Sequence, residues 1–247
     1  MKNISPEILY EDADIVVINK PAGLVVHADG RTEEPTLAGW FAKKYPNSKH
    51  VGEPIKLKAP SSKLEAVIER PGIVHRIDRE TSGALILAKT AEAHEALKQQ
   101  FKNREVSKAY HAFVHGNVKD DMGVIDLPIG RSVGDFRKWS AQRGARGEKR
   151  DAVTFYKVLS RSSDKSWTLV EAKPKTGRTH QIRVHFQALH HPVVGDSLYA
   201  PSKPKLLGFE RLALHARSLT FNKLDGEQIT VEAPYPDDFI SAIASMG

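Results

Sequence analysis

The chain has 247 residues and no cysteine, which excludes disulfide bonds, thiolate metal sites and cysteine nucleophiles. Its formal net charge of +7 predicts a polyanionic partner, because a surplus of lysine and arginine attracts phosphate. Residues 1–6 lack a signal-peptide hydrophobic region and the apolar runs are too short to cross a bilayer, so we expect a cytoplasmic protein without membrane attachment.

Three short apolar segments near the start of the chain predict paired strands. They are Ile8–Tyr10, Ile15–Ile18 and Leu24–Val26. A helix is predicted from Thr36 to Tyr45, with Thr36 as its N-cap and Pro46 just past its end. Residues 47–70 are rich in proline, serine and lysine and show no periodicity, so we expect a long exposed loop there.

A charged run at His75–Gly83 precedes the apolar segment Ala84–Ala88. The apolar segment predicts a central strand, and the charged run predicts a loop that crosses the edge of the sheet. This order places Asp78 at the lip of a cleft. Flanking arginines favour its ionised form, which suits a nucleophile or an ion-pair member. The alternative is a surface loop whose charges are solvated.

Thr90 is the predicted N-cap of a helix over Ala91–Asn103, in which Ala93, Leu97 and Phe101 face inward. Four further strands are predicted from apolar patterning. They are Ala109–His115, Gly123–Ile129, Ala152–Leu159 and Trp167–Ala172. Hairpin-joined strands with isolated helices predict an α+β fold in one domain, spanning residues 1–247, with a mixed and largely antiparallel central sheet.

The segment 131–150 is the most basic part of the chain. It contains Arg131, Arg137, Lys138, Arg143, Arg146, Lys149 and Arg150, with Phe136 and Trp139 between them. Basic and stacking groups together are typical of surfaces that bind nucleic acid, so we expect a basic RNA-binding loop here. The alternative for each residue is a solvated loop whose aromatic side chains cover the edge of the core.

A glycine turn at Gly177 leads into a predicted helix with Ile182, Phe186 and Leu189 on its buried face. Arg183 lies beside that face, where a buried guanidinium needs a carboxylate partner. Asp78 is the candidate partner, since a bidentate arginine holds a carboxylate ionised and oriented. A structural ion pair or a surface arginine remains the alternative.

Metal and nucleotide chemistry have little support in the sequence. The 11 histidines include no His-Glu-x-x-His string, and no phosphate-binding or dinucleotide-binding glycine motif occurs. We therefore expect no metal and no nucleotide cofactor.

Five motifs follow one another along the chain. They are Asn19–Gly23 with Val26 and His27, His75–Gly83, Ser107–Tyr110, Thr176–His185 and His191–Asp196. Together and in this order they resemble the RluA family of pseudouridine synthases over nearly the whole chain. Few residues precede the first predicted strand, so we expect a stand-alone catalytic domain without the S4-type domain that many members carry. Residues 47–70 make the segment before the Asp78 motif longer than in the family.

The resemblance implies roles for individual residues. Asp78 becomes the catalytic aspartate, Tyr110 the active-site tyrosine and Arg183 the partner of the aspartate, while Arg76 fills the gap left by a flipped base. The other implied substrate contacts are Lys20, Thr81, Arg178, His180 and Gln181. The reaction breaks the N-glycosidic bond of a uridine, rotates the uracil and rejoins it through carbon, without any cofactor.

The expected partner is therefore a ribosomal or transfer RNA stem-loop, bound by a protein that is predicted to be a monomer. A base inside folded RNA must be flipped out to reach Asp78, at a cost of roughly a few kcal/mol. The rival hypothesis is a non-catalytic RNA-binding or RNA-chaperone module on the same scaffold, which keeps the basic surface but does not need Asp78.

Overall fold

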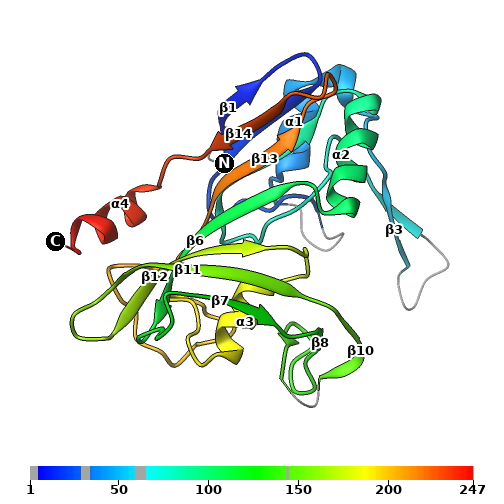
Figure 1. The fold of residues 1–247 in the computed structure, drawn as a ribbon. Coiled ribbons are helices and arrows are strands. Elements are labelled where there is room, and N and C mark those ends of the chain that lie inside the picture. Colours follow the sequence, from blue (N-terminus) through cyan, green and yellow to red (C-terminus); the bar gives the residue numbers. More distant parts are fainter. Residues whose placement is uncertain (1–4, 29–33, 59–64, 143–144, 247) are drawn as a thin grey trace. The chain divides into compact units, whose positions relative to one another are not determined.

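The computed structural model of the chain describes residues 5–28, 34–58, 65–142 and 145–246. These residues form two compact units, which we call the N-terminal and the C-terminal unit (Figure 1). The N-terminal unit consists of Met1–Val106 and Leu219–Ala233, and the C-terminal unit consists of Ser107–Ser218 and Pro234–Gly247. Strands and helices mix in both, which confirms the predicted α+β class. The single domain stays a prediction.

The N-terminal unit is a sheet with helices packed on it. Its strands are β1 (Glu7–Glu11), β2 (Ile15–Lys20), β5 (Ser82–Ala88), the end of β13 (Leu214–Asn222) and β14 (Gln228–Glu232), and its helices are α1 (Leu37–Lys44), η1 (Pro46–Ser48) and α2 (Ala91–Asn103). The strand order is β1-β2-β5-β13, with β14 paired to β13. All seven residues of β5 are buried, so the predicted central strand is confirmed.

Both helices begin where their N-cap residues predict. The hydroxyl of Thr36 accepts a hydrogen bond from the amide of Gly39 at 3.0 Å, and that of Thr90 accepts one from the amide of Ala93 at 3.3 Å. Helix α2 then buries Ala93 and Leu97 in a core that it shares with β2, β5, β13 and β14. Local sequence signals therefore fix both helix starts.

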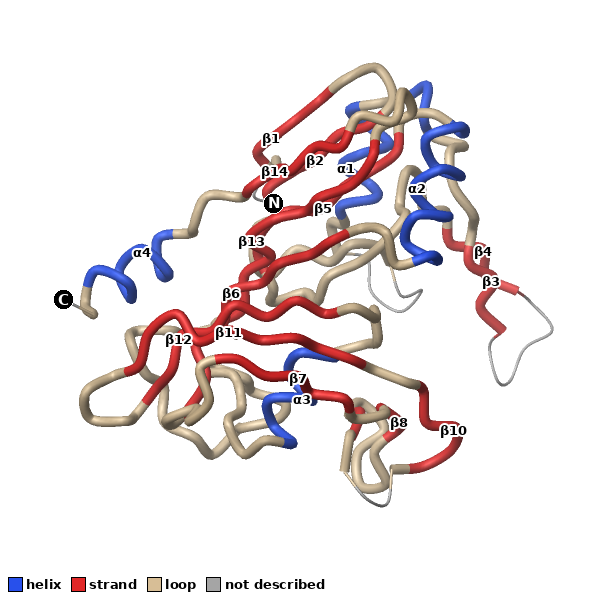
Figure 2. Tube along the Cα trace, viewed as in Figure 1, coloured by secondary structure: helices blue, strands red, loops and turns tan. Residues whose placement is uncertain are grey.

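Two predictions about this unit are wrong. Residues 24–26 form no strand; only Val25 makes an isolated parallel bridge, to Thr36. The predicted loop at 47–70 contains a β-hairpin of β3 (Ile55–Lys58) and β4 (Glu65–Ile68), which Figure 2 shows as two adjacent strands. Residues 59–64 of that predicted loop lie outside the described residues.

The C-terminal unit contains a second stretch of antiparallel sheet. Its main elements are β6 (Ser107–His115), β7 (Met122–Asp126), β11 (Val153–Arg161), β12 (Trp167–Pro174), α3 (Gln181–Ala188) and α4 (Asp237–Ala244). The strand order is β13-β6-β12-β11-β7. Ile182 and Phe186 of α3 join one core with Ala172 and partly buried Tyr156, so the helix predicted after Gly177 and its buried face are confirmed.

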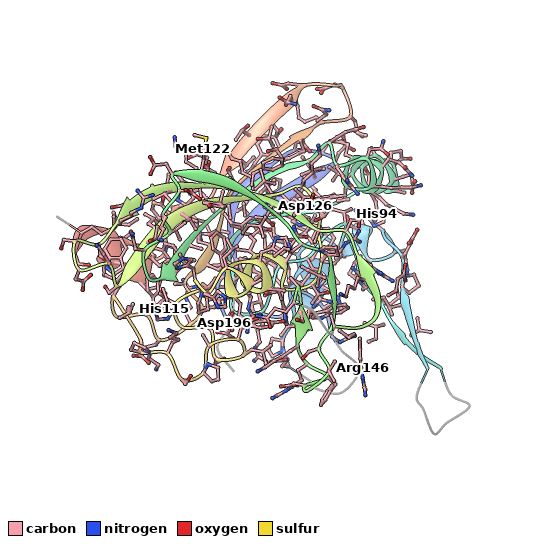
Figure 3. The ribbon with its side chains drawn as sticks, turned by 60° about the horizontal axis from the view of Figure 1, so that its bottom comes forward. His94, His115, Met122, Asp126, Arg146 and Asp196 are labelled. Carbon is pink, nitrogen blue, oxygen red and sulfur yellow. The ribbon has the colours of Figure 1, made fainter. Side chains whose placement is uncertain are left out.

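The basic segment is folded rather than a loop, which corrects the prediction for 131–150. Strands β8 (Ile129–Arg131), β9 (Trp139–Ser140) and β10 (Arg146–Arg150) form a small antiparallel sheet, which we call the basic arm. All five residues of β10 are exposed, and Figure 3 labels Arg146, its first residue. Arg143 lies outside the described residues.

No helix in the described part of the chain has the length and apolar character that a membrane crossing requires.

Candidate active site

Asp78 lies on a loop that leaves the sheet of the N-terminal unit at His75. The backbone N–H of Ile86 in β5 donates to Nε2 of His75 at 3.1 Å. The His75 ring also stacks on Phe101 of α2, with 4.6 Å between centroids. One step along, the N–H of Ala88 donates to the carbonyl of Gly72 at 2.9 Å. The imidazole of His75 thus accepts from Ile86 the hydrogen bond that a carbonyl of a neighbouring strand would otherwise accept. This contact fixes the position at which the Asp78 loop begins.

A buried lysine holds the other end of the loop. The carbonyl of Arg79 accepts hydrogen bonds from the N–H of Gly23 at 2.9 Å and from Nζ of Lys20 at 3.0 Å. Nζ also donates to the carbonyls of Pro21 and Leu24, at 2.9 and 2.8 Å. Lys20 is fully buried, and an ammonium has three protons to donate. Lys20 thus anchors the Asp78 loop, and its predicted contact with the substrate stays a prediction.

Replacing Lys20 by methionine is expected to destabilise the protein without weakening the salt dependence of RNA binding. Three carbonyls lose a charged donor, which we expect to lower the free energy of unfolding by roughly 2–4 kcal/mol. The melting temperature should fall by about 4–16 °C. Thermal melts of Lys20→Met, with Lys98→Met at a side chain that is 40% exposed as control, measure this change. A salt slope of RNA affinity reduced by about one would instead support the predicted phosphate contact of Lys20.

The two arginines that flank Asp78 have different surroundings. Arg79 forms a salt bridge with Glu34, with 2.8 Å between Nη2 and Oε2. Arg76 is exposed, and its Nη1 lies 3.5 Å from Nε2 of His27. The exposed guanidinium of Arg76 is compatible with insertion into RNA, which stays a prediction.

Thr81 closes the loop on its C-terminal side. Its backbone N–H donates to the carbonyl of Asp78 at 3.1 Å, which forms a turn. Its side chain is 1% exposed, and Oγ1 has no hydrogen-bond partner among the described residues. A buried hydroxyl without a partner is uncommon and is available to a ligand. The predicted contact between Thr81 and substrate stays a prediction.

Arg183 projects from α3 and is held by a carboxylate that the sequence analysis assigned no role. Its Nε and Nη2 donate to Oδ2 and Oδ1 of Asp196, each at 2.8 Å. Asp196, labelled in Figure 3, is 2% exposed and also accepts hydrogen bonds from the N–H groups of Leu198 and Tyr199, each at 3.0 Å. Arg183 and Asp78 belong to different units. Their predicted pairing stays a prediction, and the five donors of a guanidinium allow a second acceptor.

The turn that presents Asp196 depends on a glycine. Gly195 has φ +71°, and a Cβ at this position would come within 2.0 Å of the carbonyl oxygen of Arg211. Only glycine tolerates both the positive φ and this close approach. The run His191–Asp196, an apolar pair followed by Gly-Asp, is a sequence motif that could have singled out Asp196.

Gln181, another predicted substrate contact in the C-terminal unit, has hydrogen-bond partners within the protein. The side-chain oxygen of Gln181 accepts from the Thr176 hydroxyl at 2.7 Å and the Arg178 N–H at 3.0 Å. Its nitrogen donates to the carbonyl of Val153 and the hydroxyl of Thr154, each at 3.0 Å. Buried Gln181 has thus all four of its hydrogen bonds within the protein. These bonds give Gln181 a structural role, and its predicted contact with substrate stays a prediction.

The predicted roles of three further residues stay predictions. Arg178 and His180 are predicted to contact substrate, and Tyr110 is the predicted active-site tyrosine. Nε of Arg178 donates to the carbonyl of Asp151 at 3.0 Å. Nδ1 of His180 lies 2.9 Å from the hydroxyl of Tyr199. Tyr110 is half-buried on β6, opposite Ala172 of β12. All three side chains are at least partly accessible to a ligand.

Histidine and carboxylate side chains do not gather into a metal site in the part of the chain that the structure describes. His185 of α3 has structural partners instead, with Nδ1 2.9 Å from the Thr154 hydroxyl and Nε2 3.1 Å from the Leu127 carbonyl. Burial lowers the pKa of His185, so this imidazole is neutral at pH 7.

Aromatic and basic side chains are ordered together on the basic arm. The guanidinium carbon of Arg131 lies 4.2 Å from the centroid of the Trp139 ring. Arg137 pairs with Asp135, with 2.9 Å between Nη2 and Oδ2, in the turn that leaves Phe136 79% exposed. Exposed cations beside a bare aromatic ring are suited to phosphate contact and base stacking.

Comparisons with known proteins agree on one family. A family model described as RNA pseudouridylate synthase matches residues 14–188. The chain is 40% identical over 244 residues to an uncharacterized RNA pseudouridine synthase of Bacillus subtilis, covering 97% of this chain and 72% of that protein. It is 36% identical over 246 residues to the ribosomal large subunit pseudouridine synthase D of Zymomonas mobilis, covering 96% and 71%.

A solved structure has the same fold. Human RNA pseudouridylate synthase domain containing 4 superposes with a TM-score of 0.70 at 26% sequence identity, covering 97% of this chain and 92% of that one. The similarity therefore extends over both units.

Proposed function

The chain belongs to the RNA pseudouridylate synthase family, and on that premise we propose that it isomerises uridines of structured RNA with Asp78 as the catalytic carboxylate. The family makes it an RNA isomerase. The observation that carries the proposal for Asp78 is the loop fixed at both ends, by His75 at its start and by Lys20 at its end. A loop held in this way keeps one carboxylate in a defined place.

The proposed reaction requires a carboxylate, a group that stacks on the base and a cation. Isomerisation conserves all atoms and electrons of the uridine, so the proposed reaction requires no co-reactant. Asp78 either attacks the sugar or the uracil ring, or assists the loss of a ribose proton. Tyr110 stacks on the base or accepts a proton, and Arg183 orients Asp78. Arg76 occupies the gap that the flipped nucleotide leaves.

The basic arm is proposed to position the RNA. Its exposed cations, Arg146 and Lys149 among them, suit phosphate contacts, which orient RNA more than they specify its sequence. Phe136 offers an exposed ring for stacking. Cytoplasmic location and a monomeric state remain predictions.

Ribosomal RNA of the large subunit is the proposed target. The support is the name of a relative that is 36% identical over 96% of this chain, a ribosomal large subunit pseudouridine synthase. The alternative target is transfer RNA, and the experiment must distinguish it from large-subunit ribosomal RNA.

Pseudouridine mapping of total RNA with and without the gene is expected to show the loss of one or more sites in large-subunit ribosomal RNA. The purified protein should then release tritium from carbon-5-tritiated transcripts of that RNA. Loss of sites in transfer RNA alone would move the target to that class. RNA binding without any tritium release would favour the rival binding module.

A further inference from the structure

Tyr199 lies where three parts of the C-terminal unit meet. Its ring is buried, with 6% of the residue exposed, and the guanidinium carbon of Arg183 lies 4.9 Å from the ring centroid. Its hydroxyl lies 3.0 Å from the backbone nitrogen of Trp139 and 2.9 Å from Nδ1 of His180. The ring therefore contacts Arg183 and, edge-on, the His180 ring at 5.6 Å between centroids, while the hydroxyl contacts Trp139 and His180.

One of the hydrogen bonds of this hydroxyl has a defined direction. The N–H of Trp139 only donates, so the phenolic oxygen accepts from it. The direction of the second hydrogen bond, to Nδ1 of His180, follows the tautomer of the imidazole. His180 has φ +56° at the start of α3 and makes no side-chain cap there, because its side chain is turned to Tyr199 instead. The residue is thus held by the tyrosine, in a conformation that few residues other than glycine adopt.

Trp139 connects Tyr199 to the basic arm. It begins β9, which pairs with β8, and its ring carries the guanidinium of Arg131 at 4.2 Å. A backbone hydrogen bond from Trp139 to the Tyr199 hydroxyl therefore fixes the arm at β9, an edge strand of its sheet. The same tyrosine covers one face of the Arg183 guanidinium while Asp196 holds its edge.

We propose that Tyr199 is a positioning residue that couples the basic arm to Arg183. RNA bound on the arm fixes β9, and Tyr199 transmits that placement to the guanidinium that orients Asp78. The coupling rests on the proposed function, in which Arg183 acts on Asp78 and the arm binds RNA. Ring and hydroxyl have separate tasks, since the ring orients Arg183 and the hydroxyl anchors the arm.

Two substitutions separate these tasks in steady-state assays with a carbon-5-tritiated large-subunit ribosomal RNA transcript. Tyr199→Phe keeps the ring, so KM should rise about five-fold, the ratio that corresponds to one uncharged hydrogen bond, while kcat stays close to that of the wild type. Tyr199→Leu also removes the ring, and kcat should fall by more than about ten-fold, the upper range of a desolvated cation–π contact. Tyr156→Phe, which removes a hydroxyl elsewhere in the unit, is the matched control.

A double-mutant cycle tests the coupling itself. Arg131→Ala and Tyr199→Phe both act through β9, so their effects on kcat/KM should be less than additive by about three-fold or more. Additive effects would overturn the proposal, as would a Tyr199→Phe variant that melts earlier but keeps both kinetic constants. Failure of the proposed function shows separately, as activity that survives Asp78→Asn.

Discussion

Asp78→Asn is expected to abolish uridine isomerisation while RNA affinity changes by no more than a few-fold. Asparagine has the shape of aspartate but neither the nucleophilic oxygen nor the charge. Removal of a group that takes part in the chemistry reduces kcat by more than about a thousand-fold. Loss of one negative charge slightly favours RNA, since the phosphate backbone is anionic. Tritium release and a filter-binding titration on the same transcript measure the two quantities.

Glu80→Gln is the matched control for this prediction. Glu80 is an exposed carboxylate two residues further along the same loop, and its substitution removes the same charge. This variant should keep activity close to that of the wild type. If Asp78→Asn stayed active, the carboxylate would have no part in the mechanism. If both variants lost activity, the charge of the loop would matter rather than one particular oxygen.

Asp196→Asn is expected to cause a large loss of stability together with a loss of activity. The substitution removes the carboxylate that binds Nε and Nη2 of Arg183, a residue that is 8% exposed, and breaking a buried ion pair costs about 3–5 kcal/mol. The melting temperature should fall by roughly 6–20 °C. Urea unfolding monitored by circular dichroism gives the corresponding change in the free energy of unfolding.

A second arginine–aspartate pair provides the control. Arg211 and Asp238 have the same two-point geometry, with contacts of 2.7 and 2.8 Å, but their side chains are 16% and 27% exposed. Asp238→Asn should therefore cost less than half as much. Adding Arg183→Met to Asp196→Asn should restore part of the stability, because it removes the buried charge that Asp196 balances in the wild type. A wild-type melting curve for Asp196→Asn would show that the buried pair contributes nothing.

The predictable parts of the fold are those with local causes. Helix α2 has its predicted bounds because Thr90 caps it, and β5 is a central strand because its run is wholly apolar. Strands β13 and β14 and helix α4 were not predicted. In β13 a histidine, His215, is fully buried, and its burial is decided by residues far away in the chain. The residues next to His215 in the sequence form no pattern that predicts its burial.

In the candidate site, too, local sequence patterns fail to predict burial that depends on distant parts of the chain. Asp78 was found because its charged loop precedes an apolar strand. Lys20 and Gln181 have charged or polar side chains, yet both are buried. Their partners are carbonyls and hydroxyls on segments that only the fold brings together, so the sequence indicates surface contacts where the structure has internal ones. Tyr199 was missed for the same reason, since its partners lie on two distant segments, Trp139 on β9 and both His180 and Arg183 at the start of α3.

The N-terminal unit is assembled from two separate stretches of chain, and this order has a consequence during synthesis. β5 pairs with β13, whose residues in this unit begin at Leu219. A ribosome must therefore translate the whole of Ser107–Ser218 before the second neighbour of β5 exists. Until then, an apolar strand has part of one edge unpaired, which is the kind of edge that recruits other nascent chains. The rate at which the ribosome translates Ser107–Ser218 thus sets how long the nascent chain is exposed to aggregation.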